Sequence, residues 1–231
     1  MRTPDAYVGW INKHLGFNPR GQANSDALSD FVLSDLRQSC PTIKAALDRG
    51  ELSSRKNPNV QAGFAERSID LVLHETGRAP QISVRVSVEH KTIMTAHGKA
   101  RKNRYGDIIA YSNHVHGHRR DCVAGAIVVV NVSPAYENPD AFARGLVRPR
   151  FNMEKVVRDT VAIFEKIPLR DMPEDATELP EALAVIVVDY DGLSRSKLVA
   201  RAPAPQRDNT VYYENFIQRI CDLYGRRFSG R

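Results

Sequence analysis

Two apolar runs close together in the chain decide the fold: S-I-D-L-V-L at residues 68–73 and Q-I-S-V-R-V-S-V-E-H-K at residues 81–91. In the second run apolar and polar residues alternate, which is typical of a β-strand whose successive side chains point to opposite faces. Its valines therefore face a core, and Glu89 and Lys91 project from the same side, two residues apart. Asp70 lies in the first run, and a hairpin can bring it to the same edge.

Two carboxylates beside one lysine can hold a divalent metal ion and position a water molecule. Magnesium prefers oxygen ligands and keeps several waters, so one or two carboxylates and the phosphate oxygens of a substrate suffice to bind it. The ion lowers the pKa of a bound water and neutralises charge that develops on phosphorus. A lysine can orient or deprotonate that water and stabilise the growing anion. These residues predict a centre that cleaves phosphodiester bonds.

This arrangement resembles the PD-(D/E)XK nuclease superfamily, which includes most type II restriction endonucleases. The resemblance covers residues 64–132, with Asp70 as the first acidic residue of the motif, Glu89 as the second and Lys91 as the lysine. Ile69 stands where the name of the motif has proline. That position shapes the backbone and is not a ligand, so its replacement leaves the proposed chemistry intact.

The resemblance implies a fold, a cofactor and partners. The expected fold is α/β, with a central mixed β-sheet flanked by helices in a restriction endonuclease-like core. The expected cofactor is Mg²⁺, with Mn²⁺ as the alternative ion, held by Asp70, Glu89 and the main-chain carbonyl of His90. The expected activity is hydrolysis of phosphodiester bonds in double-stranded DNA by a homodimer of the type II restriction kind.

The whole chain, 1–231, is predicted to form one domain. It consists of a helical region at 1–50, the catalytic core at 64–132, and further sheet, helices and a possible DNA-recognition loop at 133–231. Asn24 or Ser25 is suited to cap the first long helix. Pro41 is suited to open the next helix, and Gly50 to end it.

Residues 51–63 carry little apolar pattern and are predicted to be an exposed loop. Later elements are predicted as helices at 95–116, 153–166 and 213–224 and buried strands at 124–132 and 183–190.

Two basic stretches are candidates for contact with DNA. Four cations follow the motif directly, and they could neutralise phosphates or could simply form a solvated helix face; these are Lys99, Arg101, Lys102 and Arg104. The loop at 133–150 carries Arg144 and Arg148, and arginine can read guanine bidentately. Either assignment agrees with a formal net charge of +6, which favours a polyanionic partner.

Cysteine usage and hydropathy bear on where the protein works. Cys40, Cys122 and Cys221 are odd in number and widely spaced, so the sequence predicts no disulfide and a reducing, cytoplasmic environment. No apolar run reaches the length that spans a bilayer, so we expect no membrane partner.

Other readings remain open at this point. The array His114, His116, His118 and Cys122 could bind zinc, although a cluster at a helix C-terminus, where positive charge is favoured, explains it more simply. A repair, recombination or phage nuclease of the same fold would carry the same motif, and so would a DNA-binding protein that no longer cleaves.

Overall fold

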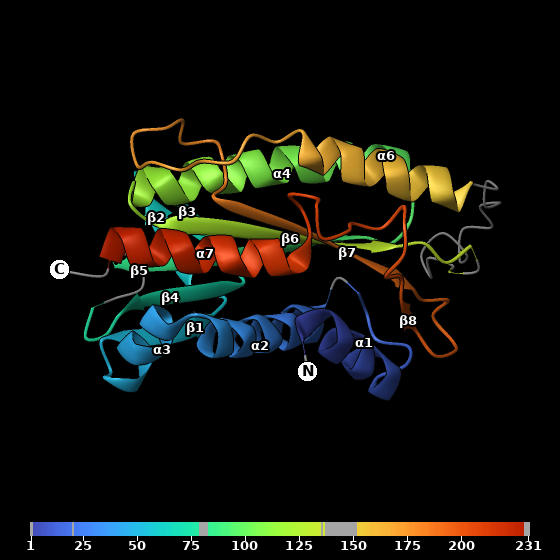
Figure 1. Ribbon diagram of the computed structural model, residues 1–231, viewed down its shortest axis with the longest axis horizontal. Helices are drawn as coiled ribbons and strands as arrows, with labels where there is room; N and C mark the ends of the chain where they lie inside the picture. The colour runs from blue at the N-terminus through green and yellow to red at the C-terminus, as the bar shows by residue number, and fades with distance from the viewer. Residues whose placement is uncertain (1, 20, 79–82, 135, 137–151, 229–231) are drawn as a thin grey trace.

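A central β-sheet covered by helices on both faces forms the body of the protein in the computed structural model, which describes all residues except 1, 20, 79–82, 135, 137–151 and 229–231 (Figure 1). The helices are α1 (Thr3–Lys13), α2 (Gln22–Ser39), α3 (Pro41–Asp48), α4 (His97–His118), α6 (Met153–Glu165) and α7 (Tyr213–Phe228). The strands are β1 (Leu52–Lys56), β2 (Asn59–Ala62), β3 (Ala65–Ser68), β4 (Leu71–Glu75), β5 (Val84–Ile93), β6 (Val123–Asn131), β7 (Ala182–Asp189) and β8 (Lys197–Leu198).

The six-stranded sheet has the order β1-β4-β5-β6-β7-β8 and is mixed. Strand β4 runs antiparallel to β1 and β5, the strands β5, β6 and β7 are parallel, and β8 returns antiparallel to β7. Parallel neighbours need a long crossover, and α4 supplies it between β5 and β6. The predicted α/β class with a mixed sheet is therefore confirmed.

Each face of the sheet has its own core. Helices α1, α2, α3 and α7 pack on the face that carries Val86 and Val88, whereas α4 and α6 cover the opposite face (Figure 1). Strand β6 is buried along its whole length, which explains its uninterrupted apolar sequence. At Gly125 a Cβ atom would lie 2.8 Å from the ring of Phe216, so only glycine lets α7 approach β6 this closely.

Residues 51–63 do not form the exposed loop that the sequence predicts. They contribute β1 and β2, which pair with β4 and β3 respectively in one continuous register, Lys56 opposite Leu71 and Asn59 opposite Ser68. The four strands are thus a single long hairpin, bent between the two pairs. Asn57 adopts a φ of +53° at the bend, a conformation that asparagine tolerates better than most residues. The apolar alternation is missing because β1 is an edge strand whose last three residues are exposed.

The predicted helix caps are partly wrong. Helix α2 begins at Gln22 after Gly21, so Asn24 and Ser25 lie inside its first turn. Asn24 is buried and accepts a hydrogen bond from the hydroxyl of Tyr7 (2.7 Å), and Ser25 binds another partner described below. By contrast, Pro41 does open α3, and Gly50 follows this helix in the left-handed conformation that commonly ends a helix.

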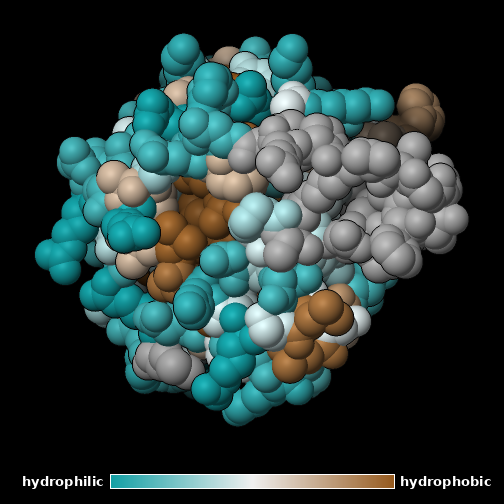
Figure 2. All heavy atoms as spheres, turned by 90° about the vertical axis from the view of Figure 1, so that its right-hand side faces the viewer, coloured by the Kyte–Doolittle hydropathy of each residue, from teal (hydrophilic) through white to brown (hydrophobic). Residues whose placement is uncertain are grey.

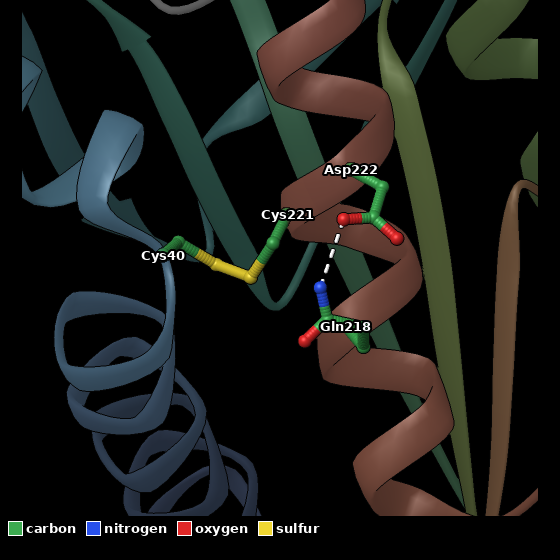
Figure 3. Close-up of a disulfide and its surroundings, with 4 residues drawn as sticks. All are labelled: Cys40, Gln218, Cys221 and Asp222. Carbon is green, nitrogen blue, oxygen red and sulfur yellow. Dashed lines mark hydrogen bonds between the residues drawn. A yellow bond between two sulfur atoms is a disulfide. The ribbon is translucent and has the colours of Figure 1, made fainter.

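A disulfide joins Cys40, which separates α2 from α3, to Cys221 on α7 (Figure 3). The prediction that no disulfide forms is contradicted. The two cysteines are 181 residues apart, and only the packing of α7 against α2 and α3 brings them together. Cys122 is buried and free. Because disulfides persist mainly in oxidising surroundings, the cysteines no longer support the predicted cytoplasmic location, which stays a prediction.

We expect the purified protein, denatured without reductant, to titrate with about one thiol per chain, since Cys122 is the free cysteine. Reduction should raise the count to three. Closing a loop of this length stabilises a chain by about 5 kcal/mol, so Cys40→Ser should lower the free energy of unfolding by an amount of that order. Cys122→Ser is the matched control for the thiol count. Three thiols before reduction would show that the bond does not form.

Four charged or titratable side chains meet in the interior beside the N-terminal end of β7. Glu181 and Arg170 are fully buried and lie 3.1 Å apart. Glu181 also contacts Arg227 (2.8 Å) and the ring of His116 (2.9 Å), and it accepts the Ala124 amide proton (2.8 Å). Burial alone would raise the pKa of Glu181, but the contacts to His116 and Arg227 outweigh it and hold that pKa below its ordinary value.

Glu181→Gln should lower the free energy of unfolding at neutral pH by about 3 kcal/mol, because it leaves buried cations without their counter-charge. A carboxylate whose folded-state pKa is depressed stabilises the fold above its unfolded-state value, and this contribution is lost as pH falls through the folded-state value. The difference between the two proteins should therefore shrink below about pH 4.5. Urea denaturation across pH measures it, with the exposed Glu178→Gln as the control. An equal effect of both substitutions would contradict this role.

Candidate active site

The residues of the predicted motif gather where β4 begins and β5 runs on past it. The last pair in this part of the ladder is Leu71 with Val88, so Glu89 and the residues after it extend beyond β4. Asp70 lies immediately before β4, at the bend of the long hairpin. Glu89 and Lys91 share one face of β5 because they are two residues apart. The polar end of β5 and the bend of the hairpin therefore meet at one edge.

The carboxylate of Asp70 is fixed by two neighbouring elements. One of its oxygens accepts the main-chain N–H of His90 (2.6 Å), and the other accepts the hydroxyl of Ser25 on α2. Ser29, one turn along α2, donates to the main-chain carbonyl of Asp70 (3.1 Å). The N–H and carbonyl of one residue in a strand face the same edge, so the His90 carbonyl faces the edge where Asp70 lies.

Glu89 is a buried carboxylate with two cationic partners. Its side chain is only 4% exposed, and its Oε1 accepts hydrogen bonds from Arg67 (2.9 Å) and from Lys91. Its Oε2 is buried and has no hydrogen-bond partner among the described residues. Burying an ionised carboxylate is costly unless cations compensate it, and Arg67 and Lys91 provide that compensation.

Arg67, like Ser25, is a residue of this site that the sequence did not reveal. It lies on β3, in the arm of the hairpin beyond the bend, and its guanidinium lies 5.7 Å from the centre of the Tyr111 ring on α4. The Tyr111 hydroxyl is itself hydrogen-bonded to Ser87 on β5 (2.6 Å). The strand partner of β3 falls within the stretch predicted to be a loop, so no pattern in the sequence pointed to this arrangement.

The imidazole of His90 lies on the opposite face of β5 from Glu89 and is buried. Burial lowers its pKa to about 4, against the opposing effect of the nearby Asp70 charge. The ring is therefore neutral near pH 7. Its Nδ1 lies 3.5 Å from the Ser25 hydroxyl, and its Nε2 has no hydrogen-bond partner in the described part of the chain.

The donor atoms at this edge suit a hard cation. Asp70 and Glu89 offer carboxylates and His90 a carbonyl, and Mg²⁺ is commonly bound by one or two carboxylates with water completing its shell. The unpartnered, buried Oε2 of Glu89 is an acceptor that a cation could satisfy. Within the described ranges, no group of three or more His, Cys, Asp and Glu side chains is placed to hold a metal ion. The ligand roles of these residues stay predictions.

The four cations after the motif divide into two pairs on α4. Lys99 and Lys102 are exposed, and no ion pair involves either of them among the described residues. Arg101 instead pairs with Asp159 (3.3 Å), and Arg104 pairs with Asp107 (2.6 Å). The two lysines are therefore the freer of the four to contact a phosphate. The candidates Arg144 and Arg148 lie outside the described residues.

The histidine array on α4 is not arranged as a zinc site. His114 and His118 hydrogen-bond to main-chain carbonyls of β2, at Val60 (2.7 Å) and Gln61 (2.7 Å). His116 points elsewhere, to Glu181. These contacts attach the β2–β3 arm to α4, and they account for the histidines without a metal.

No helix in the described part of the chain has the length and apolar character needed to cross a membrane. Comparison of the chain with protein-family models, with curated proteins and with solved structures found no match.

Proposed function

We propose that this protein is a Mg²⁺-dependent endonuclease that hydrolyses phosphodiester bonds in duplex DNA, of the type II restriction kind and active as a homodimer. The observation that carries the proposal is the hydrogen bond from the main-chain N–H of His90 to the Asp70 carboxylate, directly after Glu89 in β5, with Lys91 in contact with Glu89. The +6 net charge and the exposed lysines of α4 support a polyanionic substrate.

In this proposal each residue has a separate task. Asp70, Glu89 and the His90 carbonyl hold the ion, which when bound acidifies a water molecule and neutralises charge at phosphorus. Lys91 orients the attacking water and stabilises the negative charge that develops on the phosphate oxygens. Ser25, which donates to the Asp70 carboxylate, keeps that carboxylate turned toward β5.

Asp70→Asn, Glu89→Gln and Lys91→Ala should each slow cleavage of duplex DNA by at least about a hundredfold. Binding of DNA in EDTA should change little, because the three side chains act on the ion, the water and the transition state. Single-turnover cleavage with Mg²⁺, together with binding titrations, measures both effects. Glu66→Gln is the matched control, since Glu66 is exposed on β3 beside Arg67.

Plasmid DNA tests the class of nuclease in the same assay. Discrete fragments would support a restriction enzyme, whereas cleavage confined to junctions or ends would favour a repair, recombination or phage nuclease. DNA binding without cleavage by the unmodified protein would favour a non-catalytic DNA-binding protein. If all three motif variants cleaved at the native rate, the assignment of the site would be wrong.

Lys99→Ala and Lys102→Ala should each reduce the slope of log affinity against log salt concentration by roughly one unit, equally on all DNA sequences. Arg101→Ala and Arg104→Ala should reduce it less, because their guanidinium groups are already paired with Asp159 and Asp107.

Titrations at several salt concentrations measure these slopes. Lys44→Ala on α3, which packs on the other face of the sheet, is the control. Unchanged slopes for both lysine variants would show that this face of α4 is an ordinary solvated surface and does not contact DNA.

A further inference from the structure

We infer that Arg67 is a competing counter-ion of the metal site: its guanidinium is hydrogen-bonded to the Glu89 carboxylate, and a divalent ion bound there has to displace it. The inference rests on the proposed role of Glu89 as a metal ligand. It assigns to Arg67 control over when the site is loaded.

The first ground is that Arg67 is more exposed to solvent than the carboxylate it contacts. The Glu89 side chain is 4% exposed, whereas those of Arg67 and Lys91 are 27% and 20% exposed. The two cations are therefore the parts of this cluster that solvent reaches most readily.

The second ground is charge. Glu89 already has two monovalent cations on one oxygen, Oε1, while Oε2 has no hydrogen-bond partner among the described residues. A divalent ion bound to the same carboxylate would lie within a few ångströms of both cations, and charges of like sign repel strongly at that distance in a poorly hydrated site. Loading the ion is therefore linked to the departure of one cation.

The third ground is that Arg67 is the cation that can leave. Lys91 is on the same strand and face as Glu89, so the two are held close by the strand itself. Arg67 instead reaches across from the β2–β3 arm, which belongs to a separate two-stranded sheet. Its guanidinium already lies over the face of Tyr111, and a cation gains stabilisation over an aromatic ring. The Arg67 guanidinium can therefore keep its contact with the Tyr111 ring after it leaves Glu89.

Binding of Mn²⁺ to the full-length protein without DNA, followed by electron paramagnetic resonance, tests the inference directly. Removing Arg67 should tighten Mn²⁺ binding by about tenfold, within the usual range of coupling between two sites. Arg67→Lys keeps the charge and should leave the affinity within about threefold of the native value. Arg55→Ala is the matched control, because Arg55 is an exposed arginine on the same long hairpin, and it should leave the affinity unchanged.

Two variants serve for the removal of Arg67. Arg67→Ala removes the whole side chain, and Arg67→Met keeps an apolar stem for packing if the alanine variant does not fold. Thermal unfolding in EDTA should show both to be less stable than the native protein, since Glu89 then loses a counter-charge. A purely structural Arg67 would give this loss of stability with no gain in affinity for Mn²⁺.

Glu89→Gln separates the two ways in which the inference can fail. If it abolishes Mn²⁺ binding while the Arg67 variants bind no more tightly than the native protein, Glu89 is a ligand and the competition by Arg67 is wrong. If the native protein, the Glu89 variant and the Arg67 variants all bind Mn²⁺ equally, the proposed metal site fails, and the inference fails with it.

Discussion

The candidate site depends on one of the buried carboxylates of the protein, that of Glu89. The strand that carries it is covered by helices on both faces, so a side chain that alternation directs away from one core enters another buried region. A carboxylate in such a place requires cations. Lys91 comes from the same strand, but Arg67 can arrive only if the hairpin arm folds against α4. His114 and His118 hold that arm in place through the carbonyls of β2.

The bend of the long hairpin determines which groups the Asp70 carboxylate contacts. A straight hairpin would continue the pairing of β4 with β5, and the carboxylate of Asp70 would have no main-chain N–H to accept. Because the strand turns away at this residue, the amide of His90 is left free to bind Asp70. Ser25 and Ser29 on α2 then fix the carboxylate and the carbonyl of Asp70. The polar edge of the site is a product of the bend.

Helix α7 joins parts of the chain that are remote in sequence. Cys221 ties it to the end of α2, and Arg227 ties it to Glu181 at the start of β7. It also packs directly on Gly125 of β6. The disulfide joins α7 to the other helices of its layer, whereas the contacts with Glu181 and Gly125 fix that layer to the sheet by charge and by close packing.

The sequence alone determined the four inner strands of the sheet, β4 to β7, and the shared face of Glu89 and Lys91, because side-chain alternation and continuous apolar runs are local properties of a strand. Tertiary structure decided the rest. Arg67 lies 22 residues from Glu89, Ser25 lies 45 from Asp70, and Cys40 lies 181 from Cys221. Residues 51–63 were mistaken for a loop because an edge strand exposes polar side chains and needs no apolar alternation. Contacts between distant segments leave no periodic mark in the sequence, since they follow from how whole elements pack.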